Sequence, residues 1–329
     1  MPVKPRILVI RGGAIGDFIL TLPAIRLLRE NFPAAHLEIL GYRHIIALAE
    51  GRAYADAARS IEYGPMAGFF VPRSVLAPDL VAYFASFQQV VSYLFDPDGF
   101  FEANLRRAGV KNLLPAYAKI DDSEHAARQL ARPLQSLALY LEDHAATVHP
   151  STADRAFADE FLRSPTAVGE AGSFPYSGGA PLVALHPGSG SPRKNWPLEN
   201  WIALGASLLA GTPQPRLLLI GGEADHAQLA ALTAAWRGTP VLLARDLPLP
   251  HLAALLARCR LFLGHDTGIS HLAAAAGAPC LLLFGPTDPA VWAPANPHVS
   301  LIAAPGGDLA ALAIATVQTE LARCLGEAR

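Results

Sequence analysis

The chain has 329 residues, of which 52% are hydrophobic and 16% charged, and its formal net charge is −2. Single hydrophobic cores stop growing at roughly 250–300 residues, so this length favours two domains. The near-neutral balance, without a long run of one sign, is not typical of a nucleic-acid-binding protein, and we expect no nucleic-acid partner.

The first half of the chain alternates between strand and helix patterns. The β-branched-rich run Ile7–Ile10 predicts a buried parallel strand. Apolar residues then recur at helical spacing over Ile15–Asn31, with a kink or restart expected at Pro23. Further elements are expected as strands at His36–Leu40 and Val90–Phe95 and as a helix over 124–145.

A second alternating half follows a stretch that is rich in Gly, Ser and Pro. We therefore predict an α/β protein with two Rossmann-like, doubly wound parallel-sheet domains, 1–165 and 181–329, joined by a linker at 166–180 and facing each other across a cleft. Whether the last helix packs back on the first domain stays open. The second half is expected to have strands at Leu182–Leu185, Arg216–Ile220, Pro240–Leu243, Leu261–Leu263 and Cys280–Phe284, and helices at Leu198–Ala210, Asp225–Trp236, His251–Ala257, Ser270–Ala276 and Leu309–Leu325.

Cysteine usage and the apolar runs bear on the compartment. The three cysteines lie far apart with no CxxC spacing, so neither a zinc site nor a disulfide framework is indicated. The first apolar run is too short for a signal-peptide core, and no segment approaches the ~20 apolar residues that span a bilayer. We expect a soluble cytoplasmic protein, and contact with a membrane surface stays open.

The segment Gly264–Gly277 is typical of an anion-binding helix start. A strand ends in a tight turn, and a helix of small residues begins near Thr267 or Ser270. Free backbone N–H groups and the helix dipole attract an anion there, and Gly268 permits close approach of the backbone to a ligand. The alternative is an ordinary N-capped helix, with Asp266 or Thr267 as its cap.

A second loop, His186–Pro197, also follows a strand and precedes a helix. It contains two glycines, two serines including Ser189, and the cations Arg193 and Lys194. Loops at the carboxyl ends of parallel strands bind ligands in open α/β sheets, and these groups suit a diphosphate. A mobile surface linker is the alternative. Glu223 follows a third strand, where it either accepts hydrogen bonds from a ribose or sugar hydroxyl or is a solvated glutamate in a turn.

The glycine-containing turn after the first strand fails the dinucleotide fingerprint, because Ala14 and Asp17 stand where the second and third glycines belong. We interpret it as a close backbone approach that presents Asp17 at a helix start, facing the cleft. The dipole would keep this carboxylate ionised, so that it can act as a general base. Capping of the helix is the alternative role.

Taken in order, these motifs resemble glycosyltransferase family 9, the ADP-heptose:lipopolysaccharide heptosyltransferases, whose fold is GT-B. The resemblance covers nearly the whole chain and is strongest from residue 182 to about 294. It implies inverting transfer of heptose from an ADP-sugar to a lipid-linked glycan acceptor such as the lipopolysaccharide core, with no metal required, and possible peripheral contact with the inner membrane. The residues that carry it are Ile7–Arg11, Gly16-Asp17, Thr21–Ala24, His186–Pro197, Asp266–Gly268, His271–Ala275, Gly277–Pro279, Phe284–Pro289, Trp292 and Pro294.

The resemblance also implies roles for individual residues. Asp17 matches the catalytic base of an acceptor-binding first domain, and Lys194 matches the lysine on the donor phosphate in a nucleotide-sugar-binding second domain. Glu223 lies about where the family binds the nucleoside. The other donor or phosphate-binding residues implied are Ser189, Asp266, Thr267, Gly268 and His271.

Two features depart from the family pattern. Leu20 stands where many members have a histidine, and the apolar stretch 64–73 is either a lid or membrane-touching tip or buried core. Three other functions stay open: a GT-B enzyme that uses another nucleotide sugar, a sugar-nucleotide epimerase, and a non-catalytic sugar-nucleotide-binding protein. An NAD-dependent dehydrogenase is disfavoured by the failed fingerprint.

Overall fold

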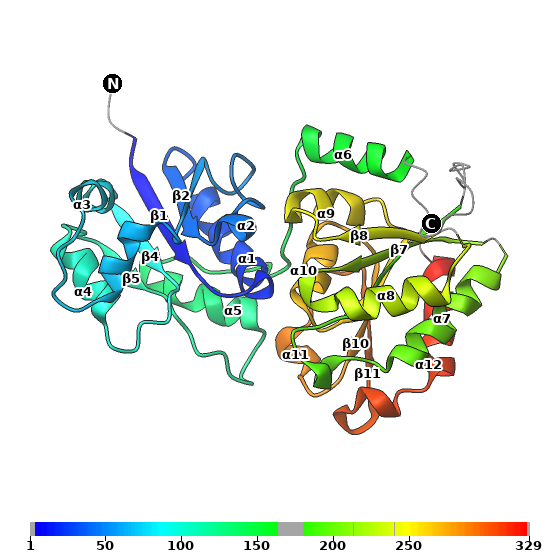
Figure 1. Cartoon of the computed structure of the whole chain (residues 1–329). Coiled ribbons are helices and arrows are strands. Elements are labelled where there is room, and N and C mark those ends of the chain that lie inside the picture. The colour runs from blue at the N-terminus through cyan, green and yellow to red at the C-terminus, as the bar shows by residue number, and fades with distance from the viewer. Residues whose placement is uncertain (1–3, 164–179, 213, 240, 328–329) are drawn as a thin grey trace. The chain divides into compact units, whose positions relative to one another are not determined.

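The computed structural model describes residues 4–163, 180–212, 214–239 and 241–327. The chain divides into two compact units, Met1–His149 and Pro150–Arg329, and each is built on a parallel sheet (Figure 1). The α/β class predicted from the alternating pattern is confirmed. Residues 166–179 of the predicted linker lie outside the described residues, whereas helix α6 (Thr152–Arg163) packs on α9 (Leu249–Leu256) in the second unit.

The first unit contains a five-stranded sheet in the order β3-β2-β1-β4-β5, and all of its pairs are parallel. The strands are β1 (Arg6–Arg11), β2 (His36–Gly41), β3 (Ala57–Ser60), β4 (Gln89–Ser92) and β5 (Leu113–Pro115). The helices are α1 (Ile15–Asn31), α2 (Arg43–Ile46), α3 (Pro78–Ala85), α4 (Phe100–Arg107) and α5 (Ala126–Ala131), with 3₁₀ turns at Gly64–Phe70 and Arg132–Leu137.

Side chains of alternate strand residues point to opposite faces, so both faces of this sheet need cover. On one face, Leu8 and Ile10 belong to a core that includes Phe69, Phe84 and Phe101, from the Gly64–Phe70 turn, α3 and α4. Helix α1 is buried along much of its length and packs with α5. The apolar stretch 64–73 is therefore partly core, because Met66 and Phe69 are buried while Phe70 and Val71 are exposed.

The second unit contains a six-stranded sheet in the order β11-β10-β9-β6-β7-β8, again with parallel pairs. The strands are β6 (Leu182–His186), β7 (Arg216–Gly221), β8 (Val241–Arg245), β9 (Leu261–His265), β10 (Cys280–Phe284) and β11 (Val299–Ala303). The remaining helices are α7 (Leu198–Ala210), α8 (His226–Ala235), α10 (Gly268–Ala275), α11 (Pro289–Trp292) and α12 (Ile314–Glu327), with short 3₁₀ turns that include Pro192–Lys194 and Glu223–Asp225.

The core of the second unit explains why its strands are apolar runs. Residues of β6, β7, β9 and β10 on one face pack with Trp201 and Leu204 of α7, Leu232 of α8, and Val317 and Leu321 of α12. Residues of the same strands on the other face are buried as well, and α10 contacts β9, β10 and α9. Helix α12 contacts α7 and β10 of its own unit.

Four expectations of local structure need correction. The helix expected over 124–145 ends at Ala131 and passes into a 3₁₀ turn, because Pro133 has no N–H to donate and clashes with the preceding turn. Strand β4 ends at Ser92 rather than Phe95. Helix α1 continues through Pro23 without the expected restart, and the last helix begins at Ile314 rather than Leu309.

Candidate functional site

The sheet of the second unit has a topological switch point between β6 and β9. From β6 the chain runs outward to β7 and β8, and it then returns to place β9 on the other side of β6. Ligands of open α/β sheets bind in the crevice outside the carboxyl ends at such a point. His186 pairs with Gly264 in the register of the two strands, so the loops that follow β6 and β9 start side by side. These are the two loops that the sequence singled out.

Lys194 and Asp266 meet between these loops. Lys194 Nζ lies 2.6 Å from Asp266 Oδ2, which also accepts a hydrogen bond of 2.8 Å from Thr287 Oγ1. The side chain of Asp266 is only 10% exposed, whereas that of Lys194 is 29% exposed. The carboxylate is thus fixed by two donors, whereas the side chain of Lys194 stays partly open to solvent.

The start of α10 lies at the same edge. Thr267 is the N-cap residue, and its hydroxyl oxygen accepts the backbone N–H of Ser270 at 3.3 Å. Within the described contacts, the backbone N–H groups of Gly268 and Ile269 have no acceptor. Such groups at a helix N-terminus, together with the dipole, form a site for an anion. The capping role is therefore observed, and it leaves these two N–H groups available to an anion.

A buried histidine and carboxylate lie behind the switch point. His186 Nε2 is 3.7 Å from Asp225 Oδ2, and His186 Nδ1 is 3.5 Å from Thr267 Oγ1. Asp225 also accepts the N–H of Gly222 at 2.9 Å. Burial by itself would raise the pKa of Asp225, but hydrogen bonds from His186 and the Gly222 N–H lower it overall. A Cβ atom at Gly188 would lie 1.8 Å from Asp225 Oδ1, so only glycine fits there.

The remaining predicted donor-site residues occupy different surroundings. Ser189 Oγ donates to Ser191 O at 2.6 Å and closes a turn in the loop after β6. His271 lies on α10 and is buried. Glu223 is exposed in the first turn after β7, next to β6 in the sheet. Ser189 and Glu223 thus stand at the carboxyl edge of the sheet, whereas His271 is largely shielded from solvent.

Asp225 and Thr287 were not predicted from the sequence to belong to the site. Asp225 was expected only as the beginning of a helix, and Thr287 lies in the stretch Phe284–Pro289, in which no residue was given a role. A carboxylate three residues after Gly222 is a capping pattern that would have located Asp225. No local pattern indicates that Thr287 donates to Asp266, because the two residues follow different strands.

In the first unit, Asp17 lies beside the switch point between β1 and β4. It is the third residue of α1, and its Oδ2 accepts the backbone N–H of Ala14 at 2.9 Å. The capping role that the sequence left as an alternative is therefore real. The side chain is still 44% exposed, so the carboxylate also stays open to a substrate. Gly13 has φ +89°, and a Cβ atom there would lie 2.7 Å from Asp17 Oδ2.

The guanidinium of Arg11 lies under this helix start. Its Nη2 donates to Asp17 O at 3.2 Å and lies 3.7 Å from Asp17 Oδ1, while its Nε donates to Thr21 Oγ1 at 2.9 Å. Burial lowers the pKa of Arg11, although Asp17 opposes that shift. The hydroxyl of Tyr93 is buried nearby without a hydrogen-bond partner among the described residues. Arg11 thus fixes the turn that presents Asp17.

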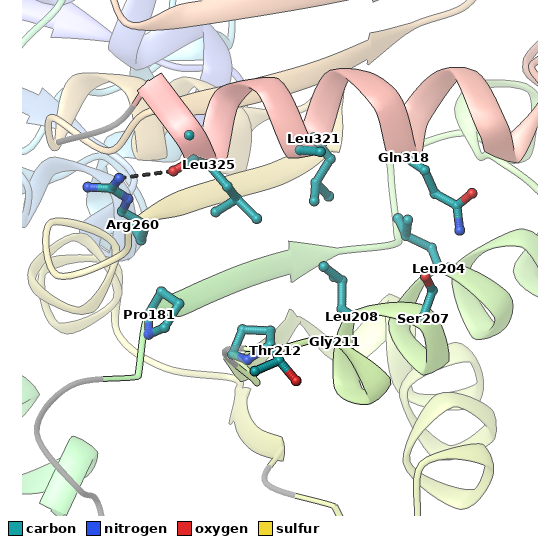
Figure 2. Close-up of a pocket in the computed structure, with 13 residues that line it drawn as sticks. Pro181, Leu204, Ser207, Leu208, Gly211, Thr212, Arg260, Gln318, Leu321 and Leu325 are labelled. Atoms are coloured by element: carbon teal, nitrogen blue, oxygen red, sulfur yellow. Dashed lines mark hydrogen bonds between the residues drawn. The ribbon is translucent and has the colours of Figure 1, made fainter.

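A cavity of about 750 Å³ lies at the opposite edge of the second sheet (Figure 2). It is bounded by α7 and α12 and by Pro181 and Arg260, which stand just before β6 and β9. Its lining is mainly apolar, and its one cation, Arg260, donates to Leu325 O at 2.9 Å. The cavity is therefore separate from the candidate phosphate-binding residues, which lie at the carboxyl ends of the strands.

The described ranges contain no helix long and apolar enough to cross a membrane. They also contain no group of three His, Cys, Asp or Glu residues arranged to hold a metal ion.

Comparisons with known proteins identify the family of the chain. Residues 116–315 match the family model "Glycosyltransferase family 9 (heptosyltransferase)". Lipopolysaccharide heptosyltransferase 2 of Salmonella typhimurium is 31% identical over 121 residues, which are 35% of this chain and 34% of that protein. Lipopolysaccharide heptosyltransferase 3 of Escherichia coli is 26% identical over 298 residues, which are 85% of this chain and 83% of that protein. The chain spans about a third of the length of the first curated relatives it matches.

Solved structures show the fold. A family 9 glycosyltransferase from Veillonella parvula has a TM-score of 0.79 and 19% identity and covers 99% of both chains. The ADP-heptose LPS heptosyltransferase II of E. coli has a TM-score of 0.71 and 17% identity, with 98% of this chain and 99% of that one covered. These likenesses confirm the predicted GT-B fold. Because the family model spans more than half of the residues, the chain belongs to glycosyltransferase family 9, the heptosyltransferase family.

Proposed function

We propose that this protein is an inverting glycosyltransferase that moves a sugar, heptose from ADP-heptose, onto a lipopolysaccharide core or related glycan. The observation that carries the proposal is the meeting of Lys194, Asp266 and the free N–H groups of α10 at one switch point. A cation and a helix start bind the diphosphate, while the fixed carboxylate accepts hydrogen bonds from sugar hydroxyls.

Departure of ADP places negative charge on the β-phosphate, and this charge needs stabilisation in the transition state. Lys194 and the N–H groups of Gly268 and Ile269 supply that stabilisation from fixed positions. Because protein groups already bring positive charge to the phosphates, we propose that the reaction needs no metal ion. A chelator should then leave the rate unchanged, and a rate that disappears with EDTA and returns with Mg²⁺ would contradict this.

The acceptor hydroxyl attacks the anomeric carbon, the bond to the β-phosphate oxygen breaks, and a base takes the hydroxyl proton. We assign the base role to Asp17. Its carboxylate is half-exposed, and the Ala14 N–H and the nearby Arg11 hold it in place. Capping uses one lone pair of Oδ2, which leaves the other carboxylate lone pairs for the proton.

The nature of the substrates rests on the family and its members. The matched relatives are heptosyltransferases of lipopolysaccharide, and one neighbour in fold is the E. coli heptosyltransferase WaaC with ADP (TM-score 0.68, 19% identity, covering 97% of this chain and 99% of that one). We propose that the enzyme works in the cytoplasm and meets its lipid-linked acceptor by peripheral contact with the inner membrane.

The donor half of the proposal is tested by a thermal-shift panel of ADP, UDP and GDP. A ligand at 100 times its dissociation constant stabilises the folded state by about 2.7 kcal/mol. We expect ADP to raise Tm by a few degrees, as such an increment does in a chain of this size. A shift with UDP or GDP but not with ADP would contradict the assignment of the donor.

The catalytic half is tested by Asp17→Asn, assayed with ADP-heptose and heptose-deficient lipopolysaccharide. Asparagine keeps an acceptor for the Ala14 N–H but cannot take a proton. We expect kcat to fall about 100-fold or more, with the affinity for ADP unchanged. Asp79→Asn is a matched control, because Asp79 is an exposed acid in the first turn of α3. Equal rates of Asp17→Asn and wild type would remove Asp17 from the base role.

A further inference from the structure

His265 is the last residue of β9 and directly precedes Asp266. Its side chain is fully buried, with 0% exposure, and the ring of Trp201 packs edge-on against it at a centroid distance of 5.3 Å. Neither the predicted donor contacts nor the proposed reaction uses this histidine. A polar ring in such a position is stable only if both of its nitrogen atoms find partners.

Both partners belong to the loop that carries Lys194. The backbone N–H of Trp196 donates to His265 Nε2 at 2.9 Å. His265 Nδ1 lies 3.4 Å from the carbonyl oxygen of Gly188. Because Nε2 accepts a hydrogen bond, it carries no proton, and the proton of the neutral ring is on Nδ1, which donates to Gly188 O. Burial lowers the pKa of His265 to about 3, which agrees with a neutral ring.

These two hydrogen bonds tie together the ends of the loop. Gly188 is also held against Asp225, where no Cβ atom fits. Trp196 is also held by its indole N–H, which donates to Leu312 O at 2.9 Å. Between these anchors stand the exposed residues Gly190, Pro192 and Arg193 and the half-buried Lys194. A single side chain of β9 thus fixes both ends of the segment that brings the cation to Asp266.

We infer that His265, as the neutral Nδ1–H tautomer, is a positioning residue that holds the loop Gly188–Trp196 in its donor-binding conformation. This inference rests on the proposed function. A loop that is ordered before the donor arrives does not lose conformational entropy on binding. Preorganisation of the loop therefore raises the affinity for the donor. His265 touches neither donor nor acceptor, and its effect on the reaction passes through Lys194.

Three substitutions separate its two hydrogen bonds. His265→Leu keeps an apolar side chain of similar size and removes both bonds. His265→Gln places an acceptor near the Nε2 position and retains the bond from Trp196. His265→Asn places a donor near the Nδ1 position and retains the bond to Gly188. We expect His265→Leu to raise the KM for ADP-heptose and the Kd for ADP about tenfold, with a much smaller change in kcat, and the other two variants to recover part of the affinity.

His298→Leu is the matched control. His298 Nε2 bonds a backbone carbonyl of the same unit, that of Ala274, at 3.0 Å, but the residue stands just before β11 at the other edge of the sheet. We expect unchanged donor KM in this variant. If His298→Leu and His265→Leu raise the donor KM equally, or if His265→Leu lowers kcat alone, the positioning role is wrong.

A second measurement does not depend on catalysis. In ¹⁵N–¹H correlation spectra of the imidazole rings, His265 should remain the neutral Nδ1–H tautomer from pH 5 to pH 8. Hydrogen exchange at the Trp196 amide should be slow in the wild type and accelerate at least tenfold in His265→Leu. A ring that titrates in this range, or unchanged exchange, overturns the inference. A wild-type protein that passes both tests but transfers no sugar would instead contradict the proposed function.

Discussion

The burial of His265 makes the stability of the second unit depend on pH. The pKa of this ring falls from an ordinary value of 6.5 to about 3 because the ring is buried away from water. The hydrogen bond to Gly188 O opposes the fall, His186 adds to it, and the nearby Asp225 and Asp266 oppose it. In the unfolded chain the ring binds a proton below pH 6.5, whereas in the folded protein it stays neutral down to about pH 3. Since the unfolded state binds more protons in that window, stability falls as the pH is lowered through it.

The size of the effect follows from linkage. Each pH unit below 6.5 costs about 1.4 kcal/mol of unfolding free energy until the folded ring itself titrates. Between pH 7 and pH 5 the loss from this residue amounts to about 2 kcal/mol. His265→Gln has no titrating ring at this position and loses that contribution, while every other titrating group remains and cancels in the comparison.

The measurement is urea unfolding of the wild type and His265→Gln at pH 7 and pH 5, followed by tryptophan fluorescence. All four tryptophans of the chain, Trp196, Trp201, Trp236 and Trp292, lie in the second unit, so the signal reports on that unit alone. The wild type should lose about 2 kcal/mol more than the variant between the two pH values. A difference below about 0.5 kcal/mol would show that the ring is charged in the folded protein or not buried.

Two glycine substitutions test how the site residues are positioned. Gly188→Ala places a Cβ atom 1.8 Å from Asp225 Oδ1. We expect the free energy of unfolding in urea to fall by about 1–3 kcal/mol and the KM for the donor to rise. Gly190→Ala is the control, because the added Cβ atom has open space around it, and it should change neither quantity. Gly13→Ala places an alanine at φ +89°, and its Cβ atom would press against Asp17 Oδ2. We expect kcat to fall while the affinity for ADP, measured by calorimetry, stays the same. An unchanged kcat would show that the Gly13 turn does not position Asp17.

How much of the fold the sequence predicts depends on how deeply each strand is buried. Ile7–Ile10 and Cys280–Phe284 were located as strands because parallel strands covered on both faces are continuous apolar runs. Strands β3 (Ala57–Ser60) and β5 (Leu113–Pro115) lie at the edges of their sheet and are only partly buried. They are also three or four residues long, so they leave no periodic signal to detect.

Part of the candidate site could also be predicted from the sequence, and part could not. The meeting of the loops after β6 and β9 was predictable, because the carboxyl ends of adjacent parallel strands share one edge. The contacts that hold these loops were not predictable. Asp225 packs against Gly188, and His265 bonds both Gly188 and Trp196. The residues in these contacts are 37 to 77 positions apart in the chain. Such pairings leave no trace in the local pattern around either residue.

The ion pair of Lys194 with Asp266 has a consequence for how a donor binds. The cation proposed to bind phosphate and the carboxylate proposed to bind sugar form an ion pair at 2.6 Å. A donor that reaches Lys194 therefore competes with Asp266, whose second hydrogen bond, of 2.8 Å, comes from Thr287. The lysine exchanges one charge-assisted partner for another, so the gain in affinity from this contact is smaller than that of an unpaired cation. Pairing keeps both groups in position before the substrate arrives, and the added affinity then has to come from the N–H groups at the start of α10, which have no partner among the described residues.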